Sequence, residues 1–114
     1  MYKCEKKFKD RYNESENILK KYPNRIPVIV EKSPQCKNLE NFDKKKFLVP
    51  GDMLMSQFIY VIRKRMKLSP EKAIFVFINN KVVPNSMLLR QIYNNDKDKD
   101  NFLYVSYSGE NTFG

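Results

Sequence analysis

Asp43-Lys44-Lys45-Lys46-Phe47-Leu48-Val49-Pro50 places a run of lysines before three apolar residues and a closing proline. Aromatic and β-branched residues favour a strand, and a proline, which cannot donate to a neighbouring strand, suits a strand end or a sheet edge. Alternation along such a strand puts Lys46 and Leu48 on one face and Lys45, Phe47 and Val49 on the other. We therefore expect an edge strand, whose lysines either only prevent self-pairing or also serve a partner.

The composition favours one basic domain without catalytic chemistry. The chain has 114 residues, with 22 Lys and Arg against 13 Asp and Glu, a net charge of +9. This charge favours nucleic acid, acidic peptides or a membrane surface as partners. Histidine is absent, which removes the usual general base and the commonest metal ligand. We expect no enzyme activity, no metal and no cofactor, and we expect Cys4 and Cys36 to be reduced thiols in the cytoplasm.

The first half of the chain predicts helices before the strands. Apolar residues recur at steps of three and four over residues 2–22, which predicts one or two amphipathic helices. Residues 25–31 are apolar on both sides, as in a buried strand, although Pro27 indicates that the early part is an edge or a bulge. A long helix is expected over residues 55–66, with Asp52 as its cap.

The second half predicts two further strands separated by a short helix. The expected elements are a strand over 73–78, a tight turn at Asn79-Asn80 with a return strand at 81–83, a helix over 87–93 capped by Asn85 or Ser86, a solvated loop over 94–101 and a strand over 102–107. The whole order describes an α+β fold, the ubiquitin-like β-grasp with two additional N-terminal helices. Its first and last strands are expected side by side in the centre.

An RNA-binding reading is kept as the alternative. The aromatic strand around Phe75 and Phe77, beside Tyr104 and Tyr107, is typical of sheets on which RNA bases stack. The glycine-containing motif of RNA-recognition domains is missing from residues 72–77. The alternative is therefore a small basic domain that binds single-stranded RNA.

Four blocks in collinear order resemble the GABARAP-type family of autophagy modifiers. They are KYPNRIPVIVEK at 21–32, DKKKFLVP at 43–50, Gln57-Phe58 with Ile62-Arg63-Lys64-Arg65, and FLYVSYS at 102–108. The resemblance implies a ubiquitin-like modifier whose terminal glycine, matched here by Gly114, is activated by E1-like and E2-like enzymes and joined to phosphatidylethanolamine. A cysteine protease would process or deconjugate it, and it would be cytoplasmic or, when lipidated, bound to autophagosomes or a related organelle membrane.

The resemblance also divides the chain into three parts. Residues 1–22 would form a helical extension, residues 23–107 the ubiquitin-like domain and residues 108–114 a flexible conjugation tail.

The resemblance further implies capture of cargo-receptor peptides with an aromatic-x-x-aliphatic motif. Such a peptide would add to the edge strand, with alternate side chains in two pockets. The aromatic pocket would use Glu14, Ile18, Pro27, Lys46, Leu48 and Phe102. The aliphatic pocket would use Phe47, Val49, Pro50, Met53, Phe58, Val61 and Ile62, while Arg25, Lys45 and Arg65 would pair with acidic flanks. Leu48→Ala, or a charge at Phe47, is expected to abolish peptide binding without unfolding the domain.

Overall fold

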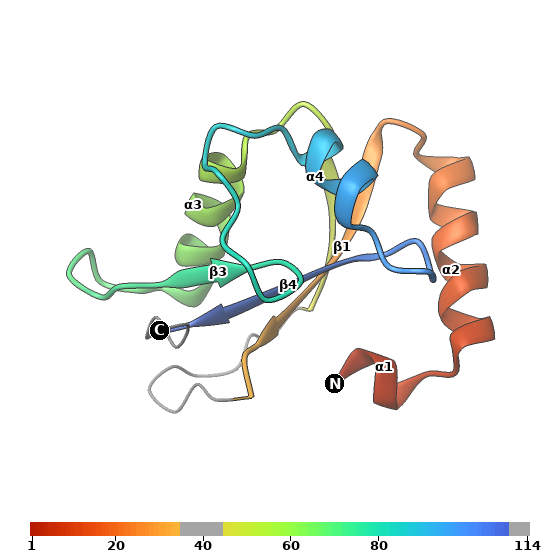
Figure 1. The fold of residues 1–114 in the computed structure, drawn as a ribbon, viewed down its shortest axis with the longest axis horizontal. Coiled ribbons are helices and arrows are strands. Elements are labelled where there is room, and N and C mark those ends of the chain that lie inside the picture. The colour runs from red at the N-terminus through yellow and green to blue at the C-terminus, as the bar shows by residue number, and fades with distance from the viewer. Residues whose placement is uncertain (35–44, 110–114) are drawn as a thin grey trace.

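The computed structural model describes residues 1–34 and 45–109, and it has the α+β ubiquitin-like fold expected from the sequence (Figure 1). Its elements in order are α1 (Tyr2–Glu5), α2 (Phe8–Lys21), β1 (Arg25–Lys32), β2 (Lys46–Pro50), α3 (Met55–Met66), β3 (Phe75–Phe77), α4 (Leu89–Asp96) and β4 (Leu103–Ser108). Within the described ranges, no helix has both the length and the apolar character needed to cross a bilayer.

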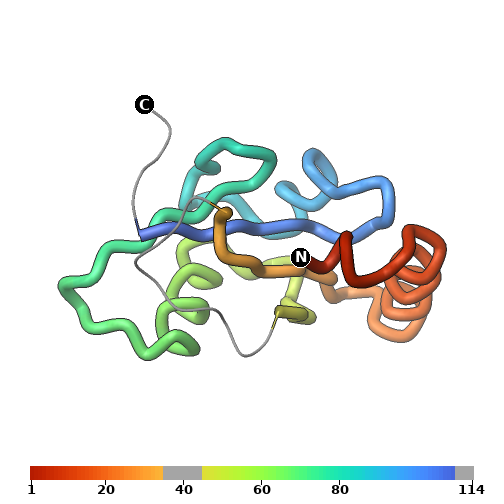
Figure 2. Tube along the Cα trace, turned by 90° about the horizontal axis from the view of Figure 1, so that it is seen from below, coloured from red at the N-terminus to blue at the C-terminus, as the bar shows by residue number. Residues whose placement is uncertain are grey.

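The sheet has the strand order β2-β1-β4-β3, so β2 lies at one edge and β3 at the other. β1 runs antiparallel to β2 and parallel to β4, and β3 runs antiparallel to β4. β1 and β4 therefore lie side by side in the centre, as predicted, and Figure 2 shows the two strands crossing the middle of the molecule together. Pro27 precedes the first pair between β1 and β4, so the proline lies where β1 is paired on one side only.

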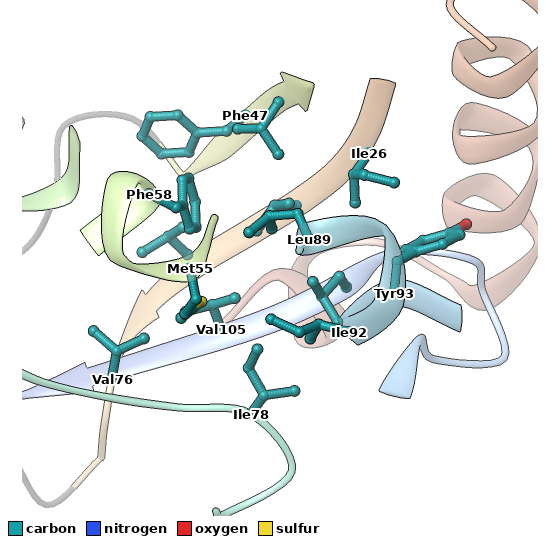
Figure 3. Packing of buried hydrophobic residues seen from close by; sticks show 14 of the residues in the cluster. Ile26, Phe47, Met55, Phe58, Val76, Ile78, Leu89, Ile92, Tyr93 and Val105 are labelled. Atoms are coloured by element: carbon teal, nitrogen blue, oxygen red, sulfur yellow. The ribbon is translucent and has the colours of Figure 1, made fainter. Parts of the chain in front are cut away.

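The two faces of the sheet are covered by different helices. Alternate residues of β1 point to opposite faces, so Val28 and Val30 join the main core with α3 and α4, while Ile29 contacts the cluster around α1 and α2. The main core packs Phe58 of α3 and Leu89 of α4 against the sheet (Figure 3). Fully burying each such side chain contributes about 1.5–3 kcal/mol, which fixes both helices on this face.

α3 and α4 begin differently from the prediction, because backbone groups and glutamines cap them. Leu54 N–H donates to the Gln57 side chain at 2.8 Å, and Leu88 N–H donates to the Gln91 side chain at 3.0 Å. Ser56 N–H donates to the carbonyl oxygen of Asn85 at 3.0 Å. The segment before α4 thus satisfies a free N–H of α3. The predicted caps Asp52, Asn85 and Ser86 are therefore wrong.

The region between β3 and β4 also differs in detail. Asn79 and Asn80 have φ values of 52° and 62°, which confirms the tight turn, and Ile78 forms an isolated bridge with Lys81. No return strand follows in this described segment. α4 extends to Asp96, into the stretch expected to be a loop.

Candidate functional site

β2 is an edge strand, and within residues 1–34 and 45–109 it pairs with β1 alone. Phe47 and Val49 are buried, whereas Lys46, Leu48 and Pro50 are half-buried, so the predicted alternation of faces is confirmed. The unpaired backbone groups along the other side of an edge strand can accept an extended chain. β2 is therefore one edge at which the sheet can receive another strand.

The six residues of the predicted aromatic pocket meet on the face covered by α1 and α2. An ion pair joins Lys46 of β2 to Glu14 of α2. Ile18 packs on the cluster that contains Phe102. Leu48 lies opposite Pro27 in the β1–β2 register. Tertiary contacts thus bring together residues from α2, β1 and β2 with Phe102, which directly precedes β4.

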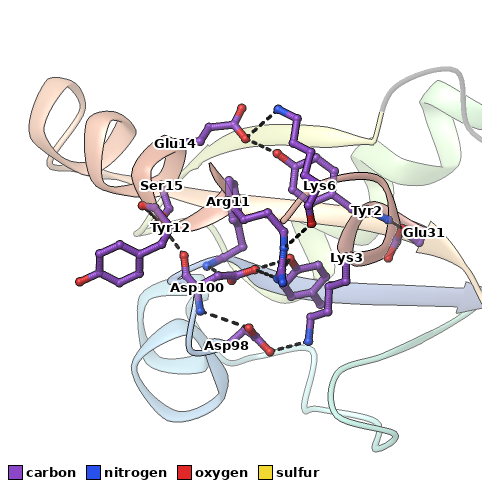
Figure 4. Close-up of polar contacts among 12 residues, drawn as sticks. Tyr2, Lys3, Lys6, Arg11, Tyr12, Glu14, Ser15, Glu31, Asp98 and Asp100 are labelled. Carbon is purple, nitrogen blue, oxygen red and sulfur yellow. Dashed lines mark hydrogen bonds and ion pairs between the residues drawn. The ribbon is translucent and has the colours of Figure 1, made fainter. Parts of the chain in front are cut away.

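Tyr2 of α1 belongs to this face, although sequence reasoning missed it. Its ring lies edge-on to Phe102 with centroids 5.6 Å apart, and the Lys46 ammonium lies 5.5 Å from the ring centroid. Its hydroxyl donates to the Glu14 carboxylate, and its N–H donates to Glu31 at 2.6 Å (Figure 4). These contacts fix α1 beside the aromatic-pocket residues. A four-residue helix is too short to show a periodic pattern, so the sequence did not predict that Tyr2 contacts these residues.

The Glu14 carboxylate is held as an anion at this junction. Partial burial by itself raises the pKa of Glu14, but hydrogen bonds from Lys46 and Tyr2, with the charges of Lys46 and Lys6, lower it below the ordinary 4.5. Burial, followed by the hydrogen bond to Glu14, raises the pKa of Tyr2. At neutral pH, Tyr2 therefore remains a neutral donor to a carboxylate.

The aliphatic-pocket residues meet on the opposite face, where four of them belong to the core. Phe47, Val49, Phe58 and Ile62 are all buried in the main cluster. The rings of Phe47 and Phe58 pack edge to face with centroids 5.9 Å apart. Met53 and Val61 are half-buried against the same cluster, and with Pro50 they form the part that a ligand can reach. A charge at Phe47 would be buried without a partner, so the expectation that it leaves the fold intact is wrong.

The three flanking cations lie in different surroundings. Lys45 pairs with Glu5 at 2.8 Å, and the hydrogen bond to Glu5 raises the pKa of Lys45. Arg25 is exposed at the start of β1, where its guanidinium donates to the carbonyl oxygen of Leu48 at 3.3 Å. Arg65 is exposed near the end of α3. Lys45 would therefore have to exchange its carboxylate partner to bind an acidic flank.

Asp100 fastens α2 to the sheet, although the sequence placed it in a solvated loop. Its buried carboxylate accepts hydrogen bonds from Arg11 and from the Tyr104 hydroxyl, both at 2.5 Å. Its carbonyl oxygen accepts from the Ser15 hydroxyl at 2.6 Å (Figure 4). The loop prediction is wrong for Asp100, because a contact 89 residues away in sequence gives its charge a partner. This network holds the helix that carries Glu14 and Ile18.

Two further expectations concern other parts of the chain. Gly114 and Cys36 lie outside the described residues. Of the four rings invoked for RNA, Phe77 and Tyr107 are buried in the fold, whereas Phe75 and Tyr104 are half-buried. None of the four is exposed, so the sheet does not present the stacking surface that the RNA alternative needs.

Comparison with known proteins gives the family. Residues 10–114 match the family described as "Autophagy protein Atg8 ubiquitin like". Autophagy-related protein 8e of Arabidopsis thaliana is 53% identical over 114 residues, covering 100% of this chain and 93% of the relative. Autophagy-related protein 8 of Candida glabrata is 54% identical over 113 residues, covering 99% of this chain and 95% of the relative.

A solved structure agrees with this assignment. Plasmodium falciparum Atg8 in complex with a Plasmodium falciparum Atg3 peptide superimposes with a TM-score of 0.90 at 37% identity, covering 96% of each chain. A family match over most of the chain, relatives above 50% identity and a shared fold agree with the resemblance found in the sequence. The chain belongs to the Atg8 family of autophagy-related ubiquitin-like proteins.

Proposed function

We propose that this chain is a non-enzymatic modifier that captures aromatic-x-x-aliphatic peptides by adding them as a strand to β2. The observation that carries the proposal is the open edge of β2 with alternate residues on two faces. A peptide strand added there would send alternate side chains toward the same two faces. The Atg3 peptide complex of the Plasmodium relative supports peptide binding as a property to test here.

The two faces suit different side chains. On the face of α1 and α2, Leu48 and Ile18 are half-buried and the charges of Lys46 and Glu14 are paired, a combination that suits an aromatic residue. On the face of α3, Met53 and Val61 lie over a fully apolar core, which suits an aliphatic residue. Acidic flanks would be attracted by the net charge of +9 and by exposed Arg25 and Arg65.

Conjugation is the second half of the proposal. Gly114 would be activated by E1-like and E2-like enzymes and linked to phosphatidylethanolamine, with a cysteine protease acting before or after the linkage. The family membership supports this role. The protein would then pass between the cytoplasm and autophagosomal or related membranes. In this scheme residues 1–22 are an extension of the ubiquitin-like domain 23–107, and residues 108–114 are the conjugation tail.

Leu48→Ala tests peptide capture directly. Leu48 is half-buried and is not a member of either core cluster, so its truncation should leave the fold intact. Loss of a central anchor typically costs about 2 kcal/mol, so affinity for an aromatic-x-x-aliphatic peptide should fall roughly 30-fold. Isothermal titration calorimetry measures the affinity, and thermal unfolding checks the fold.

The matched control is Val82→Ala. Val82 is also apolar and is exposed, and it follows β3, the strand at the other edge of the sheet. The control should bind the peptide like the unmodified chain. Equal affinities for the Leu48 variant and the control would reject β2 as the docking strand.

A further inference from the structure

A cavity of about 710 Å³ opens at the end of β2, where three elements meet. It lies among the start of β1, the turn after β2 and the beginning of α4. Its lining residues are Asn24, Arg25, Pro50, Gly51, Asp52, Leu88 and Arg90. Arg25 and Pro50 face each other in the β1–β2 register, so the cavity lies at the end of β2, next to the start of β1.

Gly51 makes room for Arg90 in this cavity. A Cβ atom at position 51 would lie 2.9 Å from both Nε and Nη2 of Arg90, closer than such atoms can approach. Arg90 N–H donates to the Gly51 carbonyl oxygen at 3.0 Å, and Gly51 N–H donates to the Asn24 carbonyl oxygen at 3.2 Å. These bonds hold the α4 backbone at the turn, and the missing side chain lets the guanidinium fold back over it.

The charges of the cavity are unpaired within the described part of the chain. Neither Arg25 nor Arg90 takes part in an ion pair there. Asp52 also lines the cavity and is exposed, without an ion pair of its own in this part of the chain. Two guanidinium groups against one carboxylate leave the cavity net positive. A guanidinium presents a planar fork of donors that matches a carboxylate.

The direction of a bound peptide follows from the two proposed pockets. The aromatic pocket uses Lys46 and Leu48, in the first part of β2, and the aliphatic pocket extends to Pro50 at the end of β2 and to Met53 beyond it. An aromatic residue that precedes the aliphatic one therefore runs in the same direction as β2. The residues after the motif would leave the strand at Pro50, which lines the cavity.

We propose that this cavity, through Arg90 and Arg25, binds the carboxylate of an acidic side chain that follows the aliphatic residue of the peptide. The inference rests on the proposed peptide capture and adds a third recognition element to it. Arg90 would then set a preference for acidic residues on the C-terminal side of the motif. Because the charges are partly exposed, this preference should weaken as salt is added.

The test compares two peptides that differ only after the motif. Both carry the same aromatic-x-x-aliphatic core and an amidated C-terminus, and one continues with glutamates where the other has glutamines. Exposed ion pairs are worth about 0.2–1 kcal/mol, so the glutamate peptide should bind roughly 1.4- to five-fold more tightly in low salt. Arg90→Met should weaken this preference, because only Arg25 then remains as a cation in the cavity, and it should still bind the glutamine peptide.

The charge-matched control is Lys72→Met, because Lys72 is exposed just before β3, at the other edge of the sheet. It removes the same charge and should keep the preference. If Arg90→Met leaves the preference unchanged as well, the cavity is not the acidic site, although peptide capture stands. If neither peptide binds the unmodified chain, peptide capture fails and the cavity assignment fails with it.

Discussion

Asp100→Asn should be strongly destabilising, because it removes one charge from a buried pair and leaves the other. The side chain of Asp100 is 0% exposed and that of Arg11 is 9% exposed, with 2.5 Å between the guanidinium and the carboxylate. Breaking a buried ion pair on one side typically costs about 3–5 kcal/mol. For a domain of this size, each kcal/mol lowers the midpoint of thermal unfolding by roughly 4 °C, so the expected loss is about 12–20 °C.

Asp98→Asn is the matched control, since it makes the same chemical change two residues away. Its carboxylate is 26% exposed and pairs at 2.6 Å with Lys3, whose side chain is 49% exposed. Such a surface pair contributes about 0–1 kcal/mol, so the control should lose less than about 4 °C. An amide at position 98 still has an oxygen to accept the Asp100 N–H, which donates to Asp98 at 3.1 Å.

Scanning calorimetry on the two variants and on a double variant decides the matter. Adding Arg11→Met to Asp100→Asn removes the uncompensated cation, so the double variant should recover part of the lost stability. Midpoints for Asp100→Asn and Asp98→Asn within about 4 °C of each other would refute the reasoning about buried charge. The result also bears on the site, because Arg11 lies on the same helix as Glu14 and Ile18.

Two further predictions concern conjugation and pH. Deletion of Gly114 should prevent formation of the lipid-linked form in a reconstituted conjugation reaction, and a lipid-linked product from the deletion variant would contradict this. The folded-state pKa of Glu14 lies below the ordinary 4.5, so its contribution to stability is present above that pH and is lost as pH falls through the lowered value. In urea unfolding at pH 7, the free energy of unfolding of Glu14→Gln should therefore be about 1 kcal/mol lower than that of the unmodified chain. This difference should become smaller toward pH 3. The same difference at both pH values would show that the carboxylate is not responsible.

The local patterns of the sequence determined the type and order of the elements. α3 spans Met55–Met66, the range that its apolar stripes predict, and the alternation in β2 places Phe47 inside and Leu48 toward the open face. Turn chemistry at Asn79-Asn80 also held, since asparagine tolerates the left-handed conformation that this turn needs. These features depend on residues only a few positions apart, so the local sequence is enough to predict them.

The helix caps could not be predicted from the local sequence, because they depend on backbone groups that are distant in the chain. The predicted caps failed because Ser56 N–H finds the Asn85 carbonyl oxygen across the fold, and because glutamines three residues inside the helices bond to Leu54 and Leu88. Helix boundaries therefore moved where tertiary contacts supplied hydrogen bonds that the local sequence did not.

Some features of the site could be predicted from the sequence, and others depend on the tertiary structure. By itself, the sequence determined an edge strand with basic residues, the fold class and a family resemblance that the comparisons confirmed. Only the tertiary structure decided that Asp100 is buried against Arg11, that Tyr2 joins the aromatic face and that Arg90 lies over Gly51. The physical reason is that burial and charge pairing depend on neighbours in space, and the partner of Asp100 lies 89 positions away in the chain.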